Sequence, residues 1–358
     1  MPSLKEIKVR INSISSTLAI TSAMKMVAAA KLQKAQMAIQ NMLPYERRLY
    51  SMLVDLMGAM NISAAASEDG SVRGSGSAER GFDQSGDRLS LSNRHDLAGM
   101  DGAYSLMAQR EVRKVAIVAF ASNSSLCGAF NSNAIREATA VINEYRASGL
   151  RDSDIVVYSV GRKMAEAMRK LGFPSPADFT KMSDSPSYEA ASALAQELLD
   201  GFVSGRFDKV ELVYNHYKST SSQPTTRQTY LPLSLADATA DIQVGKIADS
   251  ASESDTNRGA EPVGAPVVRQ GSPTTEDLIV EPSKEALIAT LLPKVIRLRI
   301  FTTLLDSAAA EHAARTVAMQ LATDNGNDLL QELTLEYNKG RQQKITSEIL
   351  DLVGGSMQ

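Results

Sequence analysis

Residues 4–60 carry one apolar repeat that constrains this chain more than any other feature. Steps of three and four residues along the segment meet an apolar side chain at all but three positions. A 3.5-residue period sustained over this length is typical of a coiled-coil helix. Such a helix would span about 85 Å, whereas a compact 100-residue domain has a radius of gyration of about 13 Å. The helix should therefore protrude, and Pro44 should kink it.

A second long helical pattern occupies residues 283–358. Its apolar face begins near Leu291 and continues to Leu352. Asn325-Gly326 is a strong turn signal, so local rules alone would split the segment into two helices there. Gly354-Gly355 should end the last helix. Antiparallel pairing of the two terminal segments is the simplest way to bury both apolar stripes.

Between them, residues 111–245 alternate strands with helices. Continuous apolar runs predict buried strands, and longer amphipathic segments predict helices. The expected strands are 115–120, 155–160, 210–217 and 226–233, and the expected helices are 132–147, 162–171 and 187–203. This order predicts a mostly parallel sheet in a Rossmann-like α/β domain.

Two polar segments flank this domain. Residues 61–110 are rich in Ser, Gly and Asp, and residues 246–282 are acidic with Gly, Ser and Pro. This composition predicts linkers or solvated insertions. The expected order is thus helix 1–60, insertion 61–110, α/β domain 111–245, insertion 246–282 and helix 283–358.

Composition excludes several classes of function. A net charge of −3 does not fit a general nucleic-acid binder. Cys127 is the only cysteine, so an internal disulfide and a Cys-rich zinc site are excluded. The three histidines lack ligand spacing, and we expect neither metal nor cofactor. No apolar run reaches about 18 residues and charges interrupt the N-terminus, so we expect a soluble cytosolic protein without a signal peptide.

The best catalytic candidate is the segment Ser122–Asn131, which follows the first strand. Ligands of α/β domains bind beyond the carboxyl ends of strands. The segment lacks the glycine spacing and the Lys-Ser/Thr pair of a phosphate loop. We therefore interpret it as a structural turn, Cys127 as a buried thiol, and His216 and His312 as structural residues.

Motifs near both ends closely resemble one family. They are Ile20–Lys31, Ala313–Met319, Ala322–Gly326, Tyr337–Gln342, Ile345–Glu348 and Val353–Gly355. The chain is similar in these segments to the gamma subunit of the rotary ATP synthase.

The resemblance implies a non-catalytic rotor. In that family an antiparallel coiled coil of the terminal helices passes through a hexamer of alpha and beta subunits. The α/β body sits below it with the epsilon subunit, on a membrane rotor ring of c subunits. The implied location is peripheral, on the cytoplasmic face of the inner membrane. The resemblance also implies that the last helix continues through Asn325-Gly326.

Six positions match family residues that contact the hexamer: Met24, Arg315, Arg341, Gln342, Thr346 and Glu348. One departure is Asn123-Ser124-Ser125, where the family often has Asp-Arg-Gly. A polar contact at this place is therefore in question. The insertions lack cysteine, so a chloroplast-type redox switch is excluded.

Two other classes of protein compete with the rotor. A nucleotide-binding α/β enzyme with helical arms would bind or hydrolyse ATP as an isolated chain. A static coiled-coil scaffold would dimerise through residues 4–60. Because this chain carries an apolar stripe in each terminal segment, pairing within one chain is favoured over dimerisation. Residues 1–48 hold eight basic and two acidic side chains, which form either a solvated helix face or a surface for an acidic partner channel.

If the insertions lie outside the hexamer, deleting residues 67–98 should leave assembly with alpha and beta subunits intact. Gel filtration and subunit stoichiometry of the variant complex would check this. Loss of assembly would contradict the placement.

Overall fold

The computed structural model describes residues 3–59, 106–107, 109–233, 281 and 284–356. Its elements in chain order are α1 (Leu4–Ala59), β1 (Val115–Phe120), α3 (Phe130–Ala147), the short 3-10 helix η3 (Asp152–Asp154), β2 (Ile155–Val160), α4 (Arg162–Lys170), α5 (Thr180–Asp184), α6 (Tyr188–Val203), β3 (Lys209–Asn215), β4 (Thr225–Leu231) and α8 (Lys284–Ser356).

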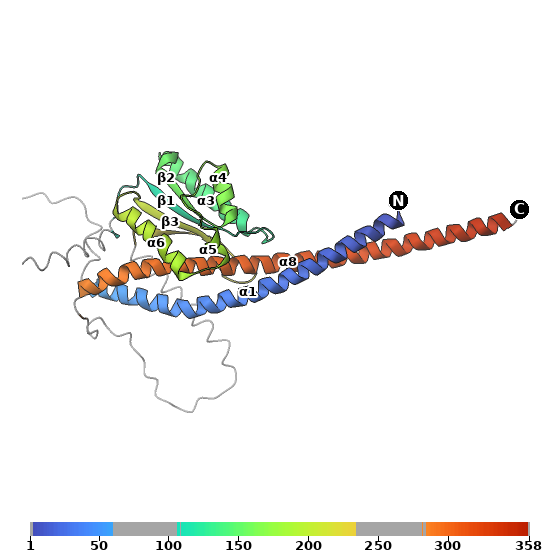
Figure 1. The fold of residues 1–358 in the computed structure, drawn as a ribbon, viewed down its shortest axis with the longest axis horizontal. Helices are drawn as coiled ribbons and strands as arrows, with labels where there is room; N and C mark the ends of the chain where they lie inside the picture. Colours follow the sequence, from blue (N-terminus) through green and yellow to red (C-terminus); the bar gives the residue numbers. More distant parts are fainter. Residues whose placement is uncertain (1–2, 60–105, 108, 234–280, 282–283, 357–358) are drawn as a thin grey trace, which may run out of the picture.

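The two long helices lie side by side and antiparallel, with both chain termini at the same end (Figure 1). The α/β domain sits on one flank of this coiled coil, toward the end away from the termini (Figure 1). The predicted fold class is therefore confirmed. A coiled coil projects from a Rossmann-like body.

The sheet of the body has the strand order β2-β1-β3-β4. β1 pairs in parallel with β2 and β3, and β4 joins β3 in antiparallel orientation as an edge strand. The sheet is thus mostly parallel, as predicted. A parallel sheet that is covered on both faces needs strands that are apolar at every position. β1 accordingly has the sequence VAIVAF, and every one of its residues is buried.

The alternating side chains of β1 enter two different cores. Ala116, Val118 and Phe120 join α6, α1 and α8 in one cluster. Val115, Ile117 and Ala119 pack on the opposite face, among side chains of α3 and α4. Because the first cluster also contains residues such as Leu53 and Leu292, the coiled coil is one wall of the body's core.

Most predicted elements match the structure within one or two residues, and β1 and β2 match at both ends. The sequence patterns missed α5, which has only five residues. The insertions 61–110 and 246–282 lie almost wholly outside the described residues. The domain boundaries drawn at them stay predictions.

The turn expected at Asn325-Gly326 from local rules is wrong, because α8 runs unbroken through both residues. Packing explains the glycine: a Cβ atom there would lie 2.6 Å from Cδ2 of Leu18 on α1. Gly340 repeats the arrangement two heptads further on, where a Cβ atom would lie 3.1 Å from Cδ2 of Leu4. Both glycines let α1 approach closely.

Other helix breakers also lie inside the long helices. α1 continues through Pro44, and α8 continues through Pro293. α8 ends at Ser356, directly after the expected terminator Gly354-Gly355. Tertiary packing therefore overrides local helix-breaking preferences at several positions.

Filling the space at Gly326 should destabilise the coiled coil. We expect Gly326→Leu to lower the free energy of unfolding by about 1–3 kcal/mol, because a new side chain would overlap Leu18. Urea titration followed by helical circular dichroism measures the change. Asn327→Leu, at the adjacent exposed position, is the control and should have little effect.

The double variant Leu18→Ala/Gly326→Leu exchanges the large and the small residue. It should recover part of the lost stability, since residues in contact couple by about 0.5–3 kcal/mol. Equal losses in the single and double variants would contradict this contact.

Candidate functional site

The half of the coiled coil beyond the body, residues 4–27 and 319–356, is called the distal coil here. Its helices meet through the Leu–Gly contacts and through a hydrogen bond of 3.2 Å from Thr323 Oγ1 to Thr21 Oγ1. Ile7 and Leu333 are buried in the seam. Two helices can cover only one stripe of each other, so the remaining surface of the distal coil faces outward (Figure 1).

That outward surface carries many large apolar side chains. The following residues are each 40–66% exposed: Val9, Ile20, Met24, Met26, Val27, Leu321, Leu329 and Leu335. Single exposed apolar residues are normal on soluble proteins. A rod that carries this many is typical of a surface that a partner covers.

The tip of α8 also exposes apolar side chains. Leu4, in the first turn of α1, lies against Gly340, and α8 continues to Ser356 (Figure 1). Exposed apolar side chains follow along this overhang: Ile345, Ile349, Leu350, Leu352 and Val353. Residues 345, 349 and 353 share one helix face at i, i+4 spacing. The tip therefore presents an apolar stripe to which α1 contributes nothing.

The sequence-predicted contact residues fall into three places. Arg341, Gln342, Thr346 and Glu348 lie together on the exposed tip. Thr346 Oγ1 donates to the Gln342 carbonyl oxygen at 2.9 Å, and Lys344 Nζ lies 3.7 Å from Glu348 Oε1. Met24, with 40% exposure, lies apart from them on α1.

Arg315 is placed differently, because its side chain is 15% exposed and turned toward the body. It pairs with Glu311 Oε1 at 2.7 Å and donates to Ser124 Oγ at 2.7 Å. Ser124 belongs to the Asn-Ser-Ser departure from the family pattern. A hydroxyl therefore supplies a polar contact at this position.

Sequence reasoning missed Ile20, Met26, Val27 and Leu335, which are exposed on the distal coil. Their position relative to the apolar repeat could have identified them. Ile20, Met26 and Val27 fall outside the 3.5-residue repeat of residues 4–60, so the seam cannot bury them. Apolar residues off the seam of a protruding coil predict a partner.

The catalytic candidate Ser122–Asn131 uses its polar groups internally. Ser122 Oγ donates to the Ser124 carbonyl oxygen at 2.6 Å, and Asn131 Oδ1 accepts from the backbone nitrogen of Ser122 at 3.0 Å. Asn123 Oδ1 accepts from the backbone nitrogen of Arg162 at 2.7 Å. Cys127 is buried. This geometry agrees with a structural turn and offers no cradle for phosphate.

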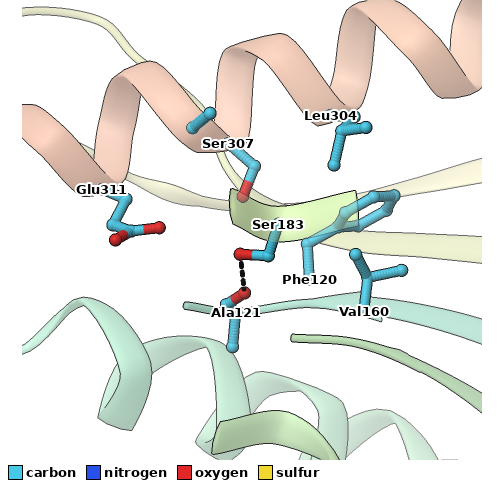
Figure 2. Close-up of a pocket in the computed structure, with 8 residues that line it drawn as sticks. Phe120, Ala121, Val160, Ser183, Leu304, Ser307 and Glu311 are labelled. Atoms are coloured by element: carbon cyan, nitrogen blue, oxygen red, sulfur yellow. Dashed lines mark hydrogen bonds between the residues drawn. The ribbon is translucent and has the colours of Figure 1, made fainter. Parts of the chain in front are cut away.

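A small cavity lies between the end of β1 and α8 (Figure 2). It is lined by Phe120, Ala121, Val160, Ser183, Leu304, Ser307, Ala308 and Glu311. Its volume of about 10 Å³ has room for about one water molecule. Burial raises the pKa of the Glu311 carboxyl, and the nearby Arg315 opposes this effect. Small-molecule sites are far larger, so this cavity does not support an enzyme.

Neither a metal centre nor a membrane span is found within the part of the chain that the structure describes. No three of its His, Cys, Asp and Glu side chains are grouped to hold an ion. None of its helices combines the length and apolar content needed to cross a bilayer.

His312 lies on α8, and the buried Nδ1 atom of its ring has no hydrogen-bond partner among the described residues. Burial, Arg315 and Lys31 all disfavour its charged form and lower its pKa to about 4. Between pH 4 and about 6.5 the unfolded chain therefore binds a proton at this position that the folded chain does not bind. The free energy of unfolding is therefore unaffected by this histidine above about pH 6.5 and decreases as the pH falls from 6.5 to 4.

We expect the wild-type chain to lose more stability than His312→Gln between pH 7 and pH 5. The difference should reach up to about 2 kcal/mol. Urea unfolding at both pH values measures it. His216→Gln removes a histidine whose pKa is raised, so this variant should differ from the wild type in the opposite direction. Parallel losses in the wild type and His312→Gln would contradict a depressed pKa.

Comparison with known proteins identifies the chain's relatives. A family model described as ATP synthase matches residues 3–357. The chain is 46% identical to the ATP synthase gamma chain of Phocaeicola vulgatus and 44% identical to that of Bacteroides thetaiotaomicron, and each match covers 100% of both chains. These matches therefore include both polar insertions.

A chain in the cryo-EM structure of the Euglena gracilis mitochondrial ATP synthase (OSCP, F1 and c-ring) shares the fold. Its TM-score is 0.52 at 18% identity, and the match covers 99% of this chain and 93% of that chain. The matches at 46% and 44% identity span the full length and carry the assignment. This chain belongs to the ATP synthase gamma chain family.

Proposed function

We propose that this chain is the central rotor shaft of ATP synthase and transmits rotation of the membrane ring to the alpha/beta catalytic hexamer. One observation carries the proposal: an antiparallel coiled coil projects from the body and bears exposed apolar side chains along its length. Family membership supplies the partners, which are the alpha and beta subunits, the epsilon subunit and the ring of c subunits.

The shaft works by shape and carries no active site of its own. One asymmetric coil inside a three-fold hexamer presents a different face to each catalytic site. Turning it as a rigid body changes which site is open, and this is a coupling free energy between sites. The sustained apolar seam supplies the stiffness that such coupling needs.

The exposed apolar surface suits a rotating contact. Apolar attraction is non-directional, so it holds the shaft inside the hexamer without favouring a single rotation angle. We assign Met24, Arg341, Gln342, Thr346 and Glu348 to this contact, since all five are exposed on the distal coil. We assign Arg315 to the same contact. It can reach the hexamer if its hydrogen bond to Ser124 breaks, or if it lies at the opening of the hexamer where the coil enters.

The proposed location is peripheral, on the cytoplasmic face of the inner membrane, with the body next to the ring. This placement is supported by the family, in which the coil enters the hexamer and leaves the body on the membrane side. The cavity beside Glu311 is too small to hold the substrate of the competing enzyme. The competing homodimeric scaffold is disfavoured because α8 of the same chain already covers the stripe of α1.

Mixing the chain with its own alpha and beta subunits tests the proposal. We expect one copy per three alpha and three beta subunits, and an ATPase rate above that of the hexamer alone. Mass measurement and a coupled ATPase assay report both results. ATP turnover by the isolated chain, without a complex, would overturn the proposal.

Two variants in the same assay sharpen it. Deleting residues 341–358, or changing Ile349 and Leu352 to Asp, should weaken the complex by about tenfold or more, because burial of each such side chain contributes about 1.5–3 kcal/mol. Leu171→Asp alters an exposed apolar residue of the body and is the control. It should assemble like the wild type.

A further inference from the structure

The loop between β3 and β4, residues 216–224, reaches out of the body and contacts both helices of the coiled coil. On α8 it meets Asp306, which accepts from the backbone nitrogen of Tyr217 at 2.9 Å and lies 2.7 Å from His216 Nδ1. On α1 it meets Gln36, whose Nε2 donates to the Tyr217 hydroxyl at 2.6 Å. Two neighbouring loop residues thus bind both helices.

Asp306 makes the directional part of this contact. Its side chain is 17% exposed, and each of its two oxygens binds a different group of the loop. The hydrogen bond to Asp306 raises the pKa of His216, which favours the charged donor. Charge-assisted hydrogen bonds are about twice as strong as neutral ones.

Tyr217 supplies the packing. Its ring is partly buried against two small clusters at once. One contains Leu32 with Ala309 and Ala313, and the other contains Cys127 and Phe130 with Ala310. The alanines of α8 leave room for the ring to lie close to the helix. Tyr217 therefore joins α1, α8 and the turn that follows β1.

The loop is itself braced. Its first backbone nitrogen, from His216, donates to the Pro224 carbonyl oxygen at 2.9 Å, which closes the loop at its base. Asn215 Nδ2 donates to the Phe130 carbonyl oxygen at 3.0 Å, and Thr225 Oγ1 donates to Asn215 Oδ1 at 2.7 Å. The loop is thus fixed to the sheet and to α3, so a force on the body reaches its contacts with the coil.

The position of the loop is mechanically important. The large apolar core between body and coil includes α8 residues from Ile288 to Leu304, and the loop binds directly after it at Asp306. Apolar packing resists separation but is non-directional, so it opposes sliding around the helix only weakly. The hydrogen bonds of the loop have fixed directions and oppose that sliding, together with the bond from the Tyr230 hydroxyl to the Ile296 carbonyl oxygen at 2.9 Å.

We propose that the 216–224 loop locks the α/β domain to the coiled coil against twist, with Asp306 as the positioning residue that holds it. The mechanical role rests on the proposed rotor function, whereas the lock itself is a property of this chain alone. Torque applied to the body then enters the coil in part at Asp306 and passes along the stiff seam to the distal coil.

Hydrogen exchange of the full-length chain tests the lock. In Asp306→Ala, the amide of Tyr217 loses its acceptor, and peptides of the loop should exchange about tenfold faster. Asp306→Asn keeps an oxygen acceptor and should restore most of the protection. Unchanged exchange in Asp306→Ala would overturn the lock.

Asp208→Ala is the matched control. Asp208 Oδ2 accepts from the backbone nitrogens of Arg113 and Lys114 at 3.0 and 2.9 Å. It therefore makes a similar carboxylate–amide contact, but within the body. Its replacement should leave exchange of the 216–224 loop at the wild-type rate.

The assembled complex tests the mechanical role. A probe on Ser153→Cys, an exposed site of the body, reports angular fluctuations while the hexamer is held still. Asp306→Ala should broaden the angular distribution at an unchanged ATPase rate, and Asp306→Asn and Asp208→Ala should keep the wild-type width. Faster exchange without broader fluctuations would overturn the torque role. Failure of the wild-type chain to assemble would overturn the rotor proposal and leave the exchange result standing.

Discussion

The structure depends on the mutual burial of the apolar stripes of α1 and α8. Two contacts hold their register in the distal coil. Leu18 lies against Gly326 and Leu4 lies against Gly340, and the two contacts are two heptads apart along each helix. A slip of one residue or one heptad would lose both of these leucine–glycine contacts. Once this register is set, the length of the α8 overhang and the height of the body along the coil follow.

The same pairing decides which surfaces remain open. Near the body, α8 has a second partner, because α6 and β3 pack against the side that the seam leaves free. In the distal coil no other described residue covers side chains such as Met26 and Leu335, and they are exposed. A coil that is half enclosed by its own body and half uncovered is suited to insertion into another protein, and the alpha/beta hexamer of this family is such a partner.

The body is built to hold the coil and does not form an active site. Its sheet is buried on both faces, the polar groups of Ser122–Asn131 bind one another, and the cavity beside Glu311 has room for about one water molecule. Its directional contacts instead point at the coil, through Ser124 to Arg315 and through Tyr217 to Asp306. The described body therefore contributes fixed contacts that hold the coil in place.

Sequence by itself determined the long helices and the α/β class, because an apolar period of 3.5 and short continuous apolar runs follow from backbone geometry alone. The family followed from the resemblance of the motifs near both ends, such as Ile20–Lys31. This resemblance also placed the exposed tip residues from Arg341 to Glu348. The resemblance implied that α8 continues through Gly326. Only the tertiary structure decided that Leu18 packs on this glycine, that Arg315 turns toward Ser124, and that Asp306 receives the β3–β4 loop. These outcomes depend on side chains that are distant in sequence, such as Leu18 against Gly326, and no local pattern records what a residue meets across a packed interface.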